Sequence, residues 1–255
     1  MDKQMIKKKF GKLTLEIHDD RTVMGAAAGA AAAEAIRETL AAKGAARVIF
    51  AAAPSQNETL AALVAAPDID WGRVSAFHMD EYLGLAPDAP QRFACYLEEH
   101  VFGKVKFGAT HLICGSGEPP ELVCDAYARK LAEAPIDLVC LGIGENGHIA
   151  FNDPPADLDD PQAVRIVTLD EVCRRQQVND GCFPDIGAVP EQALTLTVPR
   201  LLDARRLVCT VPGPRKHDAV RRTCYGEISG ECPASALRTH GGVTMYVDRD
   251  CWGDD

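Results

Sequence analysis

Short apolar runs alternate with longer helix-like stretches along most of this chain. Helical patterns fill most of the gaps, and the longest is the Ala-rich stretch 20–43, which Gly44 ends. Strands separated by helices predict an α/β fold with a doubly wound, mostly parallel sheet and flanking helices. Because no linker or internal repeat stands out, we expect a single α/β domain over residues 1–255. The strand-like runs lie at 13–17, 47–52, 74–77, 111–114, 136–141, 164–167, 193–198, 207–211 and 243–247.

The net charge limits the kinds of molecule that the protein can bind, and the cysteine content indicates its cellular compartment. The formal net charge of −10 argues against nonspecific binding to nucleic acid or to an anionic membrane, although a local positive patch could hold a small phosphorylated compound. The ten cysteines include no CxxC pair, which favours reduced thiols and a cytoplasmic location. The apolar stretch 26–36 is too short to span a membrane, and the charges in LTLEIHDDR (13–21) do not fit a signal peptide.

The segment LGIGENGHIAFNDPP (141–155) carries the strongest functional signal. An apolar run ends there at a Gly-rich turn, and Asn146, His148 and Asp153 follow within a few residues. Acid–base groups gather at the carboxyl ends of strands in α/β enzymes, so we predict that His148 transfers protons. Gly144 and Gly147 also fit a G-x-G-x-x-G fingerprint, but the prolines at 154–155 cut short the helix that a dinucleotide site needs.

A second polar strand end is HMDEYLGL (78–85). Asp80 and Glu81 are adjacent, so alternation along a strand would aim them in opposite directions, one of them into a pocket. The alternative is that Asp80 is an ordinary cap or turn residue. Two polar strand ends together favour the active-site interpretation.

Two further segments open helices after strands and could hold an anion. SQNET (55–59) offers Ser55 and Gln56, and PGPRKHDAV (212–220) offers Lys216 at a helix start, where positive charge gains nothing from the helix dipole. Arg174 and Arg175 are additional cationic candidates for binding the substrate. The alternatives are a capping segment and a solvated basic surface.

A metal site is the weaker alternative for the polar residues. His78, Asp80, His148 and Asp153 are suitable ligand types, but no HxH, HExxH or cysteine-based spacing supports a site. We therefore predict acid–base chemistry without a metal or an organic cofactor.

The segments HMDEYLGL (78–85) and LGIGENGHIAFNDP (141–154) resemble the glucosamine-6-phosphate deaminase family, and matching segments at 193–220 and 232–248 extend the resemblance through nearly the whole chain. That family shares its α/β fold with 6-phosphogluconolactonases and resembles ribose-5-phosphate isomerases. The resemblance implies an enzyme that converts a phosphorylated amino sugar to fructose 6-phosphate and ammonia without a cofactor.

The resemblance also implies residue roles. Asp80 matches the base that moves a proton from C2 to C1, and His148 matches the residue that opens the sugar ring. Asp153 falls where the family places a Glu that supports this histidine. Lys216 matches the phosphate-binding lysine, and Ser55 lies in the position of the phosphate loop.

The chain departs from the family pattern at Asn146, where the family usually has Asp, and this change predicts a lower pKa for His148 and slower ring opening. Asp153 is one methylene shorter than Glu, the loop AAAPSQNET (51–59) lacks paired glycines, and the family's phosphate-binding Arg has no clean counterpart. Two rival functions therefore stay open: a 6-phosphogluconolactonase-type hydrolase, and a sugar-phosphate-binding protein with a weakened catalytic set. A homo-oligomer also stays open.

Overall fold

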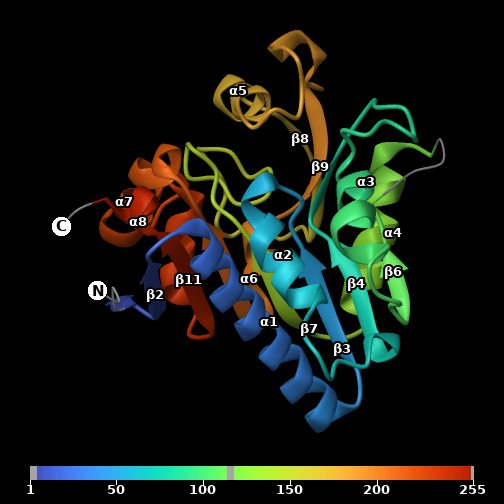
Figure 1. Ribbon diagram of the computed structural model, residues 1–255. Coiled ribbons are helices and arrows are strands. Elements are labelled where there is room, and N and C mark those ends of the chain that lie inside the picture. The colour runs from blue at the N-terminus through green and yellow to red at the C-terminus, as the bar shows by residue number, and fades with distance from the viewer. Residues whose placement is uncertain (1–4, 114–117, 254–255) are drawn as a thin grey trace.

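The computed structural model describes residues 5–113 and 118–253, and its centre is an eight-stranded sheet. The strand order is β1-β2-β11-β10-β7-β3-β4-β6, with β1 antiparallel to β2 and the neighbouring pairs among the other strands parallel (Figure 1). The predicted α/β fold with a mostly parallel sheet is confirmed. The strands are β1 (Ile6–Phe10), β2 (Leu13–His18), β11 (Val243–Asp248), β10 (Ala204–Val211), β7 (Ile136–Leu141), β3 (Ala46–Phe50), β4 (Val74–His78) and β6 (Ala109–His111).

Helices cover both faces of this sheet because alternate residues of the central strands face opposite layers. On β7, Val139 and Leu141 belong to a core that includes α4, α6, α7 and α8, whereas Leu138 and Cys140 pack in the core with α1, α2 and α3. These helices are α1 (Arg21–Lys43), α2 (Asn57–Val64), α3 (Phe93–Leu97), α4 (Pro120–Ala132), α6 (Val198–Leu202), α7 (His217–Tyr225) and α8 (Arg249–Trp252).

The long helix α1 has the boundaries that its sequence predicts. Asp20 caps its first turn by accepting a hydrogen bond from Val23 N, and Gly44 ends it in the left-handed conformation with φ of 78°. Gly25 lets α2 approach closely, because a Cβ there would lie 2.2 Å from Glu58 Cβ. Across residues 5–113 and 118–253, neither α1 nor another helix has the combination of length and apolar character that crossing a membrane requires.

A second, smaller sheet was not expected. The runs at 164–167 and 193–198 do form strands, β8 (Val164–Thr168) and β9 (Gln192–Leu196), but they pair antiparallel with each other and with β5 (Asp80–Tyr82) rather than joining the main sheet. Strand β5 escaped prediction because its DEY sequence is polar. The helix α5 (Glu171–Asn179) follows β8 and precedes β9 along the chain, and it projects with these strands at the top of Figure 1.

Candidate active site

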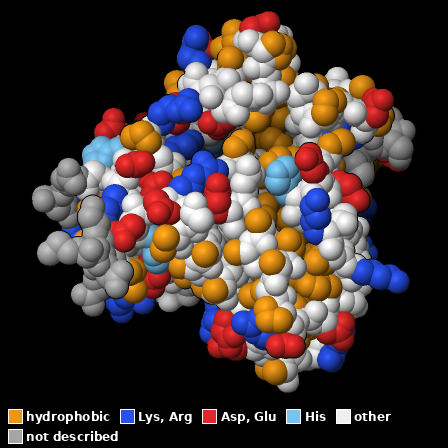
Figure 2. Space-filling view, in the orientation of Figure 1, with side chains coloured by type: hydrophobic (Ala, Val, Ile, Leu, Met, Phe, Trp, Pro, Cys, Tyr) orange, Lys and Arg blue, Asp and Glu red, His pale blue; other side chains and the backbone are white. Residues whose placement is uncertain are grey.

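A cavity of about 210 Å³ lies at the carboxyl edge of the main sheet. The residues that follow β3, β4, β7 and β10 line it, as expected for the edge at which parallel strands end together. Helix α5 adds Gln176 and Gln177 to the wall, and its C-cap residue Asp180 also lines the cavity. Figure 2 shows Lys and Arg side chains gathered on the front face, between the projecting α5 region and the body of the protein.

Asp80 faces this cavity, and Glu81 does not. Asp80 is the first residue of β5, lines the cavity and is 6% exposed. The next residue points the other way: the Glu81 carboxylate accepts hydrogen bonds from Phe93 N at 3.1 Å and Ala94 N at 3.0 Å, where α3 begins. The expected alternation is therefore present: Asp80 takes the pocket position, and Glu81 lies outside the cavity lining and holds the start of α3.

The surroundings of Asp80 make its carboxylate a stronger base than usual. Burial raises its pKa well above the ordinary value, and the neighbouring charge of Glu81 raises it further. Burial also raises the pKa of Glu81, but hydrogen bonds from backbone N–H groups and the charge of Arg92 oppose this effect. A carboxylate with a raised pKa is well suited to take a proton from carbon near neutral pH.

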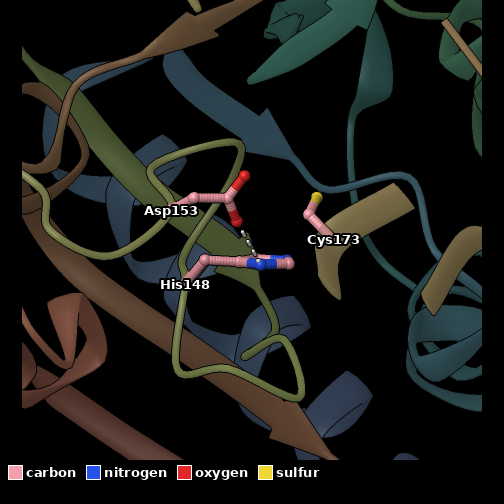
Figure 3. Close-up of side chains that lie close together, drawn as sticks. All are labelled: His148, Asp153 and Cys173. Atoms are coloured by element: carbon pink, nitrogen blue, oxygen red, sulfur yellow. Dashed lines mark ion pairs between the residues drawn. The ribbon is translucent and has the colours of Figure 1, made fainter. Parts of the chain in front are cut away.

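His148 and Asp153 form a pair on the loop that follows β7. Asp153 Oδ1 lies 3.0 Å from His148 Nδ1, and the two side chains point toward each other in Figure 3. His148 is 7% exposed and lines the cavity, whereas Asp153 lies behind it. A carboxylate in this position orients the imidazole and stabilises its protonated form.

Two glycines shape the loop around this pair. A Cβ at Gly144 would lie 2.2 Å from His148 Cε1, so only glycine leaves room for the ring. Gly147 has φ of +93°, and a Cβ there would lie 2.8 Å from Cys232 Sγ. Gly144 lines the cavity, and Gly147 shapes the turn without lining it.

Asn146 does not line the cavity but holds the His148–Asp153 pair together. Its Nδ2 donates to Asp153 Oδ1 at 3.0 Å, and its Oδ1 accepts from His148 N at 3.0 Å. Burial alone would raise the pKa of Asp153, but its contacts with His148, Asn146 and the N–H of Asp170 lower it overall. Asp153 therefore supplies a carboxylate to the imidazole, and the amide of Asn146 bonds to both members of the pair.

Cationic side chains also line the cavity. Lys216 is only 8% exposed, and burial, followed by the charge of Arg215, lowers its pKa against the opposing effects of Asp180 and Glu145. Ser55, Arg215 and Arg21 also line the cavity. An anion such as a phosphate would compensate the burial of the Lys216 charge, whereas the more exposed Arg21 and Arg215 lie near Glu58 and Glu145.

Arg21 was missed by the sequence analysis. It opens α1 directly after β2, and its guanidinium is anchored by Glu58 Oε1, 2.8 Å from Nε, and by the carbonyl oxygen of Pro54. The signal was present, since Arg21 opens a helix after a strand just as Ser55 and Lys216 lie between a strand and a helix.

Comparison with known proteins identifies the family to which this geometry belongs. The family described as glucosamine-6-phosphate isomerases/6-phosphogluconolactonase matches residues 19–246. The chain belongs to this family. A glucosamine-6-phosphate deaminase of Listeria monocytogenes is 33% identical over 196 residues, which cover 77% of this chain and 82% of that protein.

Solved structures agree with this assignment to the glucosamine-6-phosphate isomerase/6-phosphogluconolactonase family. A monomeric glucosamine-6-phosphate deaminase superposes with a TM-score of 0.84 at 28% identity, covering 93% of this chain and 98% of its own. A 6-phosphogluconolactonase from Shewanella baltica shares the fold, with a TM-score of 0.75 at 18% identity over 96% of this chain and 99% of its own.

Three residues predicted to bind substrate lie outside the cavity lining. Gln56 is fully buried, and its Nε2 donates to Leu141 O at 3.2 Å and to Thr210 O at 3.3 Å, so it joins the ends of β7 and β10. Arg174 Nη2 donates to the carbonyl oxygens of residues 186 and 189 at 2.8 and 2.9 Å. Arg175 is exposed and pairs with Glu171, one helical turn away. These three side chains therefore hold local structure.

The structure brings together only part of the weak metal set, because His148 contacts Asp153 whereas His78 and Asp80 lie outside the cluster that could hold a metal. Among the described residues, the cluster that could hold a metal is instead His148, Asp153 and Cys173, whose ligand atoms lie within 4.8 Å of one another (Figure 3). Burial, and then the charges of Asp153 and the N-cap carboxylate of α5, raise the pKa of the Cys173 thiol well above its usual value. Metal binding needs the thiolate, and both oxygens of Asp153 already accept hydrogen bonds, so these three side chains form a hydrogen-bonded cluster rather than a prepared metal site.

Proposed function

We propose that this protein is an amino-sugar-phosphate deaminase that converts glucosamine 6-phosphate, or a close epimer, to fructose 6-phosphate and ammonia. The observation that carries the proposal is that Asp80 and His148 line one cavity together with Lys216. A base, an imidazole and a buried cation are the three groups that ring opening and proton transfer on a phosphorylated sugar require. The name of the Listeria monocytogenes relative supports the same reaction.

The cationic part of the cavity holds the phosphate in this proposal. Lys216 and Arg21 supply positive charge, and Ser55 supplies a hydroxyl. With the phosphate fixed there, the sugar ring extends toward His148 and Asp80. Holding the reacting carbon near both groups removes much of the entropic cost of reaction.

His148 opens the sugar ring by moving a proton between the C1 hydroxyl and the ring oxygen, and Asp153 stabilises the imidazolium that forms. Asp80 then removes the C2 proton of the open-chain aldehyde, which leaves an enolamine, and the proton returns to C1. The resulting C2 imine adds water and releases ammonia, leaving the ketone of fructose 6-phosphate. No step of this scheme needs oxidation or reduction.

A panel of sugar phosphates tests this function. Glucosamine 6-phosphate and galactosamine 6-phosphate are each incubated with the purified chain, and ammonia and ketose phosphate are measured together. The proposal expects equal amounts of both products from at least one of the two sugars. Hydrolysis of 6-phosphogluconolactone without ammonia release from either sugar would instead identify a lactonase. Thermal stabilisation by several sugar phosphates without turnover would identify a binding protein.

We propose further that the chain acts in the cytoplasm as one domain. The reduced state of its cysteines fits that compartment, since nine described cysteines are free thiols. A solved glucosamine-6-phosphate deaminase that is similar to this chain is described as monomeric, which supports activity without a homo-oligomer. Size-exclusion chromatography with light scattering, run beside the ammonia assay, tests whether a monomeric fraction is active.

A further inference from the structure

The N-terminal cap of α5 is bonded to the His148–Asp153 pair. Asp170 Oδ1 accepts a hydrogen bond from Cys173 N at 2.5 Å and so caps α5. Its second oxygen, Oδ2, accepts from Asn146 Nδ2 at 3.3 Å, and its backbone N–H donates to Asp153 Oδ2 at 3.3 Å. One residue therefore begins a helix and contacts both partners that hold His148.

The amide of Asn146 is the centre of this arrangement. Its Nδ2 lies between two carboxylates, those of Asp153 and Asp170, while its Oδ1 accepts from the backbone N–H of His148. The position needs donors on one side and an acceptor on the other. Asparagine meets both needs, and a carboxylate at 146 would face two others with no donor to offer.

We propose that Asn146 and Asp170 are a matched pair that positions the His148–Asp153 dyad, with Asp170 acting on the dyad through Asn146. This inference rests on the proposed function, because it assigns these residues a purpose in the proton transfers at His148. It also accounts for the amide at 146 without any loss of catalytic capacity. Two carboxylates still contact the side chain of residue 146. One is that of Asp153, on the same loop, and the other is that of Asp170, at the start of α5.

Helix α5 is held to the catalytic loop at a second point, which strengthens the connection. Glu145 N donates to Gln176 Oε1 at 2.8 Å, and Gln176 also lines the cavity. Helix α5 and its cap therefore contribute both to the cavity wall and to the support of His148. The other groups packed around this unit are the neutral thiol of Cys173 and Arg222 of α7, whose Nη1 donates to Asn146 O at 3.2 Å.

The first test separates capping from positioning by replacing Asp170 with Ser. A serine hydroxyl still caps α5 at Cys173 N, but its one oxygen cannot hold both that N–H and Asn146 Nδ2. We expect kcat to fall by roughly 10- to 100-fold, as for a catalytic group displaced by about 1 Å, with the melting temperature nearly unchanged. Asp185→Ser is the matched control, because exposed Asp185 caps Ala188 N far along the chain from the dyad. Full activity in Asp170→Ser would overturn the proposal.

The second test uses the pairing itself. Asn146→Asp places three carboxylates together and should lower kcat more than Asp170→Ser does. Adding Asp170→Asn removes one of these charges and turns an amide donor toward position 146, so the double variant Asn146→Asp/Asp170→Asn should regain at least tenfold of the lost activity. If Asp170→Asn changes kcat by the same factor in Asn146→Asp as in the unmodified chain, the two residues act independently and are not a matched pair.

The pH profile of kcat/KM distinguishes positioning from a merely structural role. A third carboxylate beside the dyad favours the imidazolium, so the acidic limb should move to higher pH in Asn146→Asp and return in the double variant. Asp170→Ser removes a negative charge and should move the limb to lower pH. An unmoved limb in all three variants would contradict the proposal.

A readout that needs no substrate keeps this inference separate from the proposed function. The imidazole of His148 can be titrated by NMR, with His148→Gln to assign its signal among the seven histidines. A lower imidazole pKa in Asp170→Ser than in the unmodified chain supports the positioning network even if no amino-sugar phosphate is turned over. Identical titration curves in the two proteins would overturn the network even if ammonia is released.

Discussion

The two ends of the cavity are built in different ways. At the His148 end, side chains are bonded to one another: Asp153 contacts the imidazole, and Asn146 joins the carboxylate to the backbone of the loop. At the Lys216 end, cations gather, and burial lowers the pKa of the lysine itself. The first end is organised by bonds between its own side chains. At the second end Glu58 anchors Arg21, and the buried charge of Lys216 is the one that a ligand anion would balance.

This difference separates rate from affinity. Preorganised groups stabilise charge that develops during the reaction, so changes at the His148 end should act mainly on kcat. Groups that neutralise the phosphate bind the substrate and the transition state alike, so changes at the Lys216 end should act mainly on KM. The predictions below test this division.

The largest effect is expected from Asp80→Asn. The amide keeps the shape of the side chain but cannot take the C2 proton, so kcat should fall by about 10²- to 10⁴-fold, the usual range for loss of a general base. Binding of the sugar phosphate should persist and can be measured by calorimetry.

Asp88→Asn is a suitable control for this variant, because Asp88 is exposed and belongs to the loop that follows β5. The control should match the unmodified chain in kcat and KM. Retention of full activity in Asp80→Asn would show that another group takes the proton.

A smaller loss is expected from Asp153→Asn. Contacts with His148 and Asn146 help to hold the pKa of Asp153 below its ordinary value, so the group is ionised throughout the neutral range. Its replacement removes the charge that stabilises the imidazolium, and kcat should fall by roughly 10- to 100-fold with the acidic limb of the pH profile displaced to lower pH. Stopped-flow or coupled ammonia assays from about pH 5 to about pH 9 measure both the fall in kcat and the displacement of the limb. An unchanged limb would mean that Asp153 does not tune His148.

The difference between the two sheets explains how much of the fold was readable from the sequence. Six strands of the main sheet were predicted because most of their residues are apolar and buried, as those of β7 are at all six positions. The largely exposed β1 was not predicted, and β6 lies at 109–111 rather than at 111–114, of which position 114 lies outside the described residues. The small sheet was not recognised as separate, because strand pairing depends on which elements meet in space. Runs such as 193–198 reveal that a strand exists, but not its partner.

The site divides in the same way. Asp80, His148 and Lys216 were found because each follows an apolar run, and a parallel sheet brings such ends to one edge. The partners of these residues come from more distant segments: Arg21 comes from the start of α1, and Asp170 from the start of α5. Asp170 has no distinctive local pattern, whereas Arg21 shares with Ser55 and Lys216 a position between a strand and the body of a helix.

The loop at 153–163 illustrates a limit of composition. Its prolines and aspartates are typical of a mobile lid, yet none of its residues lines the cavity, and Asp160 is buried and bound to Arg165. Part of the cavity wall comes instead from α5, whose sequence EVCRRQQVN reads as an ordinary polar helix. Composition indicates irregular backbone, but it does not tell where that backbone lies.

At the Lys216 end of the cavity, Lys216→Met should raise KM by roughly 10- to 100-fold, because it removes a charge-assisted hydrogen bond to the phosphate. The value of kcat should change by less than about threefold, because this bond stabilises the bound substrate and the transition state equally. Inorganic phosphate should inhibit the unmodified chain competitively, and it should inhibit Lys216→Met much more weakly. Lys12→Met, at an exposed lysine, is the matched control. A fall in kcat with KM unchanged would break the proposed division between the two ends.

The smallest effect concerns the free energy of unfolding, which the buried carboxylate of Asp80 lowers when it is ionised. Burial raises the pKa of Asp80 in the folded chain above its value in the unfolded chain. Below the unfolded pKa both states are protonated, and Asp80→Asn should melt at the same temperature as the unmodified chain. As pH rises, the unfolded state ionises first, so the unmodified chain loses stability relative to the variant until the pH passes the folded pKa. Each unit of difference between the two pKa values is worth about 1.4 kcal/mol, and each kcal/mol corresponds to roughly 2–4 °C for a chain of this size. Melting curves of both proteins across this pH range measure the gap, and a variant that melts lower at every pH would show that the ionised carboxylate stabilises the fold instead.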